Sequence, residues 1–454
     1  MNTPSDAAAE LRLSEVMAAL SYALDVTEGQ PEGHAVRSCL IGMRIAEALG
    51  LDVEQRSALF YGLLLKDAGC SSNSAKIASL FGNDDFDVKR RFKLADQTRP
   101  VEGLLSVCRI SGSLGAFLRV LRPGSEVTKA MTELRCERGA EIARMLELPA
   151  ESARAIYALD EHWDGRGHPY GLAGEEIPLL ARILCLSQTV EVFHDRHGLD
   201  AALKMAQKRA GTWFDPQLVT ALQSLHSDTA FWDSLRAADL RAQVSELEPP
   251  ELTIRADDDR LDRVAEAFAK VIDAKSPFTF QHSARVAAIA DDLAAGLGLD
   301  QYQRRELRRA ALLHDIGKLT ISNQILDKPS GLSDEEFTRM KQHPAFTVRI
   351  LERVSPFVRI AMIAGTHHEK LDGSGYPWGL QQLSQPARIL VVSDIYEALT
   401  AVRPYRDALD PSQALAIMAK EAGTKLCADS FGALGSSAFS DDLKPGPPLP
   451  GAAV

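Results

Sequence analysis

The chain has 454 residues, which exceeds the usual size of one hydrophobic core and therefore predicts two or three domains. Its net charge of −11 excludes a general attraction to nucleic acid or anionic lipid, so an anionic ligand must meet positive charge that is supplied locally. Because the sequence has no apolar run of membrane-spanning length and no basic leader before an apolar segment, we expect a cytoplasmic protein without membrane contact.

In chain order, the predicted elements form one series that occurs twice. LLLKDAG from Leu63 returns as ALLHDIG from Ala311, and DGRGHPYG from Asp164 returns as DGSGYPWG from Asp372. A repeat on this scale indicates two homologous units. We place the units at residues 12–226 and 257–435, with a linker at 227–256 and a Pro/Gly-rich, disordered tail at 436–454.

Apolar residues inside each unit recur with the spacing of a helix. Val286, Ile289, Leu293 and Leu297 follow three- and four-residue steps, and Pro386 stands where a proline favours the first turn of a helix. Strands with alternating polarity are absent from the pattern. The sequence therefore predicts an all-α fold with two tandem helical bundles.

Histidines of the second unit lie at the starts and ends of its predicted helices. Packed helices build metal sites from such positions. Imidazole and carboxylate groups without thiolates favour iron, manganese, nickel or zinc. Seven groups exceed the needs of one tetrahedral ion, so we predict two divalent ions that share Asp315, an arrangement used to cleave phosphate esters. The seven predicted ligands are His282, His314, Asp315, His343, His367, His368 and Asp394.

Two of the motifs, HDIGK at 314–318 and HHEKLDGSGYP at 367–377, resemble the HD-GYP family of HD metal-dependent phosphohydrolases. The resemblance spans roughly residues 270–430. It implies HD-type helical domains that bind iron or manganese and hydrolyse cyclic di-GMP to pGpG, GMP or both through a metal-bridging hydroxide. It also implies that the same seven residues are metal ligands. Members with three metals have a glutamate where this chain has Phe278, so we expect two metals here.

The resemblance further implies contacts with substrate. Lys318 would lie against the scissile phosphate and act in catalysis with Asp315, while Arg403 and Arg406 would contact the dinucleotide phosphates. The turn of Gly375, Tyr376 and Pro377 would contact substrate or a signalling protein such as a diguanylate cyclase. As alternatives, Lys318 could cap a helix end, Tyr376 could be a packing residue, and the glycines of the turn could serve backbone shape alone.

The first unit lacks most of the ligand set. Its counterparts of the ligands are Lys66 and Asp67 for His314 and Asp315, Leu159 and Asp160 for His367 and His368, Gln188 for Asp394, a position near Arg138 for His343, and the retained His34. We predict that this unit binds no metal and that Lys66 pairs with Asp67 or Asp160 in place of one. Its role would be regulatory or structural, through contact with the second unit or through a ligand.

Three functions remain open at this point. The leading one is a cyclic di-GMP phosphodiesterase. The second is a phosphohydrolase of another nucleotide such as cyclic GMP-AMP, because the metals set the reaction whereas the pocket sets the substrate. The third is a signalling module that binds cyclic di-GMP with little turnover.

Overall fold

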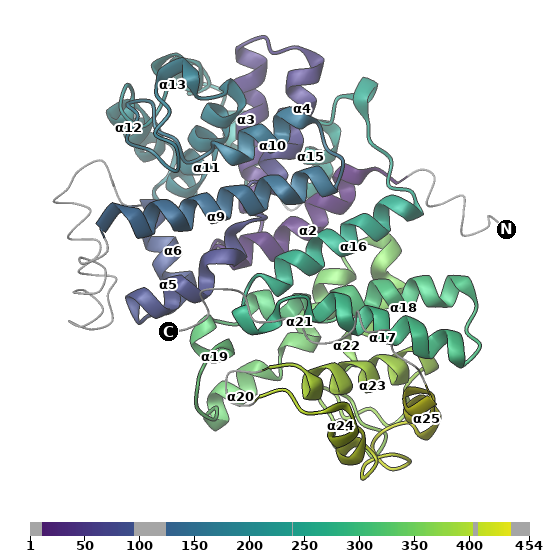
Figure 1. Cartoon of the computed structure of the whole chain (residues 1–454). Helices are drawn as coiled ribbons and strands as arrows, with labels where there is room; N and C mark the ends of the chain where they lie inside the picture. The colour runs from purple at the N-terminus through teal and green to yellow at the C-terminus, as the bar shows by residue number, and fades with distance from the viewer. Residues whose placement is uncertain (1–10, 95–123, 238, 403–406, 437–454) are drawn as a thin grey trace. The chain divides into compact units, whose positions relative to one another are not determined.

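A computed structural model describes residues 11–94, 124–237, 239–402 and 407–436 (Figure 1). Every regular element among these residues is a helix, and pairing between extended segments is limited to isolated bridges. The predicted all-α fold is therefore confirmed. A search of the same residues finds no helix that is long and apolar enough to cross a membrane. The chain divides into two compact units, Met1–Arg260 and Leu261–Val454.

The first unit is a bundle around α3, α4 and α11. Helix α3 packs against α4 and α11, and α10 packs against α4, α9 and α11. The helices of this unit are α2 (Leu13–Thr27), α3 (His34–Ala48), α4 (Val53–Leu65), α5 (Ser74–Phe81), α6 (Asp85–Leu94), α9 (Gly124–Met145), α10 (Ala150–Tyr157), α11 (Leu179–His197), α12 (Leu199–Arg209), α13 (Pro216–Ser224), α14 (Thr229–Ser234) and α15 (Leu240–Glu246).

The segment 227–256, expected as a linker, folds as part of the first unit. Its helix α15 packs against α2 and α3. Glu248 is buried and accepts hydrogen bonds from the Ser14 hydroxyl at 2.7 Å and the Tyr61 hydroxyl at 2.5 Å. Because these bonds join residues far apart in the sequence, the unit extends past the expected boundary at 226. The expected tail at 436–454 lies, from 437 on, outside the described residues.

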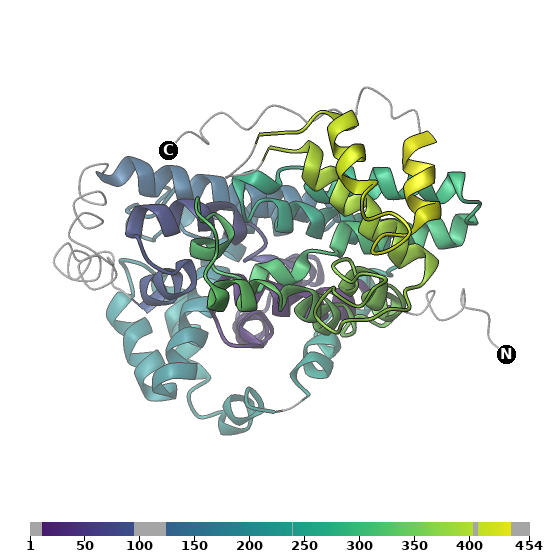
Figure 2. The same cartoon turned by 90° about the horizontal axis from the view of Figure 1, so that it is seen from below.

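The second unit repeats this bundle around α17, α18 and α23. Helix α17 packs against α18 and α23, and α22 packs against α18 and α21. The final helices, α24 and α25, contact α23 and are yellow in Figure 2. The helices are α16 (Asp258–Asp273), α17 (His282–Gly296), α18 (Gln301–Leu313), α19 (Asn323–Leu326), α20 (Asp334–Met340), α21 (His343–Leu351), α22 (Val358–Gly365), α23 (Gln385–Thr400), α24 (Pro411–Met418) and α25 (Ala428–Ser436).

Local signals fix where the helices of this unit begin. The Asp300 carboxylate accepts the Gln303 amide at 2.8 Å and caps α18, while Ser384 caps α23 with Pro386 in the first turn. The helix start that was predicted at Pro386 is confirmed. These caps place His314 directly after α18 and Asp394 inside α23.

Gly317 permits a close approach between the chain after α18 and helix α21. A Cβ atom on Gly317 would lie 1.9 Å from the His343 carbonyl oxygen and 2.9 Å from the Thr347 amide nitrogen. The Thr347 hydroxyl donates to the His314 carbonyl at 2.8 Å and accepts the Gly317 amide at 3.1 Å. The glycine of the HDIG motif is therefore required for packing, which brings His343 beside His314 and Asp315.

We expect Gly317→Ala to destabilise the second unit by at least about 1–3 kcal/mol, because overpacked backbone must move apart. The matched control is Gly296→Ala at the end of α17, where no atom lies within 4 Å of the added Cβ. That change should be neutral or stabilise by less than about 1 kcal/mol. Chemical denaturation followed by circular dichroism measures both. Equal midpoints for the two variants would contradict this packing role.

Candidate metal centre

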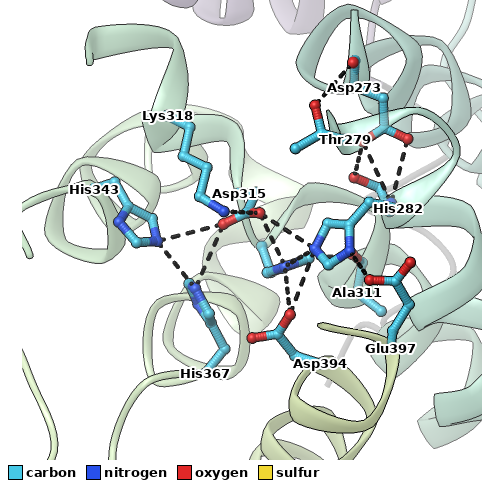
Figure 3. Close-up of polar contacts among 12 residues, drawn as sticks. Asp273, Thr279, His282, Ala311, Asp315, Lys318, His343, His367, Asp394 and Glu397 are labelled. Carbon is cyan, nitrogen blue, oxygen red and sulfur yellow. Dashed lines mark hydrogen bonds and ion pairs between the residues drawn. The ribbon is translucent and has the colours of Figure 1, made fainter. Parts of the chain in front are cut away.

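The seven predicted ligands converge on one buried position in the second unit (Figure 3). They come from three helices and from the chain that follows two others: His282 begins α17, His343 begins α21 and Asp394 lies in α23, whereas His314 and Asp315 follow α18 and His367 and His368 follow α22. All are buried except His368, which is partly exposed. The structure thus brings together residues that are up to 112 positions apart (394 − 282 = 112).

The carboxylate of Asp315 lies between two groups of imidazoles. Its Oδ2 atom is 3.4 Å from His282 Nε2 and 3.3 Å from His314 Nε2. Its Oδ1 atom is 3.4 Å from His343 Nε2 and 3.6 Å from His367 Nε2. Each oxygen therefore faces its own pair of nitrogen ligands, on opposite sides in Figure 3.

The remaining two ligands divide between the same two sides. Asp394 Oδ1 is 3.4 Å from His282 Nε2 and 3.7 Å from His314 Nε2, on the Oδ2 side of Asp315. His368 belongs with His343 and His367, since nitrogen atoms of all three lie within 4.8 Å of one another. The site thus offers two sets of donors that share one carboxylate.

Asp315 Oδ1 is buried and receives no hydrogen bond from the described residues. A buried acceptor without a partner costs about 1–3 kcal/mol, and more when it is charged. A cation between Oδ1 and the imidazoles would remove this cost, so this atom is evidence that the donor set fits a metal ion.

Hydrogen bonds at Nδ1, the ring nitrogen that faces away from Asp315, orient four of the histidines. In each case Nδ1–H donates away from the centre, which leaves the Nε2 lone pair free to face Asp315. His282 donates to Glu397 Oε2 at 2.5 Å. The other three donate to the carbonyl oxygen three residues earlier: His314 to Ala311 at 2.7 Å, His343 to Met340 at 2.7 Å and His367 to Ala364 at 2.6 Å.

Burial keeps these groups in the protonation states that bind metal. It lowers the pKa of His343, and, together with neighbouring imidazoles, it lowers the pKa of His367 and His368 well below the ordinary value. Burial alone would raise the pKa of Asp315, but the charges of His314 and Lys318 hold that pKa well below its usual range. Burial therefore favours neutral imidazoles at His343, His367 and His368, beside an ionised carboxylate.

Two functional residues were missed from the sequence: Glu397 and Arg285. Glu397 accepts a hydrogen bond from His282 Nδ1 at Oε2. Its Oε1 atom accepts a second bond from Arg285 Nε–H at 2.8 Å. A carboxylate behind a ligating histidine fixes the ring and increases its basicity. The repeat held the signal, because Glu191, Arg37 and His34 stand at the equivalent positions of the first unit and make the same contacts.

The GYP turn lies against the same centre. The Tyr376 ring is 4.7 Å from the His368 ring, and the Tyr376 amide donates to the His368 carbonyl at 3.1 Å. Buried Glu369 accepts the amides of Trp378 at 2.8 Å and Leu380 at 2.9 Å and so braces the turn. A Cβ on Gly375 would lie 2.4 Å from the Lys370 amide nitrogen, so backbone packing requires this glycine.

The remaining predicted contacts are basic. The Lys318 ammonium lies 2.6 Å from Asp315 Oδ2, with 21% of its side chain exposed. Lys318 therefore lies at the edge of the metal centre, and capping of a helix end does not account for its position by itself. Arg403 and Arg406 lie outside the described residues.

A family model for the HD domain matches residues 121–218 and 266–429, which is more than half of the chain. The chain belongs to the HD domain family, in its HD-GYP branch. It is a phosphodiesterase of that family, and the HD phosphohydrolases depend on metal.

Relatives match nearly the whole chain or about a third of it. The 3'3'-cGAMP-specific phosphodiesterase 3 of Vibrio cholerae is 43% identical over 93% of this chain and 94% of its own length. A cyclic di-GMP phosphodiesterase of Pseudomonas aeruginosa is 40% identical over 32% of this chain and 35% of its own. Among solved structures, the cyclic GMP-AMP specific phosphodiesterase V-cGAP3 of V. cholerae matches with a TM-score of 0.64 and 39% identity, over 95% of this chain and 99% of that one.

In the first unit, lysine ammonium groups lie beside Asp67, the counterpart of Asp315. Lys66 contacts Asp67 Oδ2 and lies 3.0 Å from His34 Nε2. Lys93 lies 3.6 Å from Asp67 Oδ1 and 2.9 Å from Glu28 Oε2. Each oxygen of Asp67 thus faces one lysine ammonium group. In the same way, each oxygen of Asp315 faces one pair of imidazoles.

One detail of the expected correspondence is confirmed and one needs correction. Lys66, predicted to pair with Asp67 or Asp160, pairs with Asp67, whereas Asp160 pairs with Arg135. The counterpart of His343 was expected near Arg138 but is Arg135, one helical turn earlier (343 − 208 = 135).

The close contacts of the two glycines establish this register. A Cβ on Gly69 would meet the Arg135 carbonyl at 1.9 Å and the Gly139 amide nitrogen at 2.7 Å, which matches the position of Gly317 against His343 and Thr347. The sequence could not give this register, because the two units differ in length between these landmarks.

We expect Asp315→Ala to abolish metal loading and hydrolysis together, because both donor sets lose their shared ligand. Metal content per chain, measured by inductively coupled plasma mass spectrometry, tests the first effect. Asp292→Ala, at an exposed position of α17, is the matched control and should keep both properties. An Asp315→Ala protein that is fully loaded and active would refute the assignment.

For the first unit, we expect Lys66→Met to cost about 3–5 kcal/mol, since it leaves Asp67 as a buried charge with one close cation removed. Lys76→Met, at an exposed lysine of α5, should change stability by less than about 0.5 kcal/mol. Denaturant unfolding of both variants provides the comparison. The idea fails if Lys66→Met unfolds at the same midpoint as the control.

Proposed function

We propose that the second unit hydrolyses a phosphodiester bond of a 3'3'-linked purine cyclic dinucleotide with the help of two divalent metal ions. The observation that carries this proposal is the position of Asp315, whose two oxygens face separate groups of imidazoles at 3.3–3.6 Å. A shared carboxylate of this kind suits two adjacent ions.

The donor sets fit two ions of iron or manganese. One ion would be held by His282, His314, Asp394 and Asp315, and the other by Asp315, His343, His367 and His368. Imidazole and carboxylate donors suit these metals, and the buried, unpartnered Oδ1 of Asp315 supports the presence of a cation. The chemistry that such ions supply is charge stabilisation at the phosphate and acidification of a water molecule.

The protein's own residues orient the metal ligands and supply positive charge for the substrate phosphate. Glu397 and the three backbone carbonyls keep four Nε2 lone pairs, those of His282, His314, His343 and His367, directed inward, so these donors are organised before a ligand arrives. Lys318, partly exposed beside Asp315, supplies a positive charge for a phosphate oxygen. The Tyr376 hydroxyl is protonated at neutral pH, as in an ordinary tyrosine, and can donate a hydrogen bond; burial, followed by the charges of Asp394 and Asp315, raises its pKa further.

Cyclic GMP-AMP is the substrate that we favour. The relative named for 3'3'-cGAMP aligns across both units, over 93% of the chain, whereas the P. aeruginosa cyclic di-GMP phosphodiesterase aligns over 32%. Cyclic di-GMP, the substrate that the motifs alone implied, is the second candidate because that shorter alignment reaches 40% identity. For the first unit we propose a metal-free regulatory or structural role, and for the GYP turn a further role in binding a signalling protein.

The test presents 3'3'-cGAMP and cyclic di-GMP to the manganese- or iron-loaded full chain, separately and in competition, with products separated by chromatography. We expect linear dinucleotide from both and a kcat/KM at least about tenfold higher for 3'3'-cGAMP, a ratio that corresponds to about 1.4 kcal/mol. Asp315→Ala is the inactive control. Higher kcat/KM for cyclic di-GMP would reverse the substrate choice, and tight binding without product would indicate a sensor.

A further inference from the structure

The residues of the metal centre differ in exposure. His282, His314, Asp315, His343 and His367 are at most 2% exposed, and Asp394 is 7% exposed. Lys318, His368 and Tyr376 are partly exposed. On the side of these last three residues, side chains of the site are within reach of a ligand.

A series of aromatic rings leads outward on that side. The His368 ring lies 4.7 Å from Tyr376, and Tyr376 lies 6.4 Å from Phe337 with the two planes at 73°. Phe337 is 46% exposed. Single exposed apolar residues are common on proteins, but this one contacts a tyrosine whose ring packs against His368 of the metal centre.

The helix that carries Phe337 is attached to the metal centre. Met340, the last residue of α20, accepts the Nδ1–H of the ligand His343 at 2.7 Å. At the other end, the Ser333 hydroxyl accepts the Glu336 amide at 3.3 Å, and Lys328 bonds Glu336 Oε2 at 2.6 Å. The position of the Phe337 ring relative to His343 is therefore fixed by the short helix and its caps.

We propose that Phe337 is a stacking surface for one purine base of the substrate, placed outside the metal centre beside Tyr376. This inference rests on the proposed function. Purine bases stack on aromatic side chains whatever their sequence context, and a flat ring held near the scissile phosphate matches that chemistry. The Lys341 ammonium, 4.8 Å from the centre of the Phe337 ring, provides a donor for a purine O6 or N7 atom or for a phosphate.

The test measures kcat and KM of the metal-loaded full chain on 3'3'-cGAMP, cyclic di-GMP and methyl p-nitrophenyl phosphate, a diester without a base. We expect Phe337→Leu to raise KM for the cyclic dinucleotides by about tenfold, with kcat within about twofold, because base stacking on an aromatic ring is lost. The rate on the simple diester should not change. Phe337→Tyr keeps the ring and should restore KM.

Tyr302→Leu is the matched control, because Tyr302 is another exposed aromatic residue, 51% exposed, on α18. It precedes His314 by twelve residues (314 − 302 = 12), which places it about 18 Å along the helix from the ligand. It should leave KM unchanged for every substrate.

The outcomes separate this inference from the proposed function. An unchanged KM in Phe337→Leu, with normal wild-type turnover of cyclic dinucleotide, would overturn the base-stacking role alone. An equal loss of rate on the simple diester would also overturn it, since that result indicates displacement of His343 through α20. If the wild type cleaved the simple diester but no cyclic dinucleotide, the substrate proposal itself would fall.

Discussion

The site is organised by one carboxylate that is shared between two groups of ligands. Asp315 is buried, ionised and surrounded by imidazoles, and its charge would be costly if no cation faced it. The packing of the surrounding helices places the other ligands around Asp315. The close contact at Gly317 brings α21 to the end of α18, and the other ligands lie at a helix start, just after a helix end or, for Asp394, inside α23. Helix packing thus holds the Asp315 carboxylate at a position where a metal ion can compensate its negative charge.

Much of this arrangement followed from the sequence. The two units, the all-helical fold and the meeting of all seven ligands were predictable, because helical periodicity and repeated motifs are local signals and the ligand set is unusual. The shared role of Asp315 also followed from the number of donors. These predictions required only residue types, their spacing and the placement of helix ends.

Other features required three-dimensional contacts. Glu397 lies 115 residues from the ring that it supports (397 − 282 = 115); its retention as Glu191 in the first unit marks it as a candidate, but only the fold shows which ring it contacts. The equivalence of Arg135 with His343 depends on a backbone contact at Gly69, whereas counting residues gave Arg138. The segment 227–256 looked like a connector because of its prolines, yet Glu248 ties it into the first unit through buried hydrogen bonds. Long-range pairing decides each case.

The lysines of the first unit differ from metal ions in one further respect. Lys66 and Lys93 are covalent parts of the chain, so their ammonium groups cannot leave the site and their supply does not depend on a free concentration. Ligand-held ions stabilise a fold only to the extent that their free concentration exceeds the dissociation constant. With the two proposed ions bound, the second unit would lose its cations when metal becomes scarce, whereas the lysines of the first unit would stay in place. The two halves of one repeated fold would then respond unequally to the metal content of their surroundings.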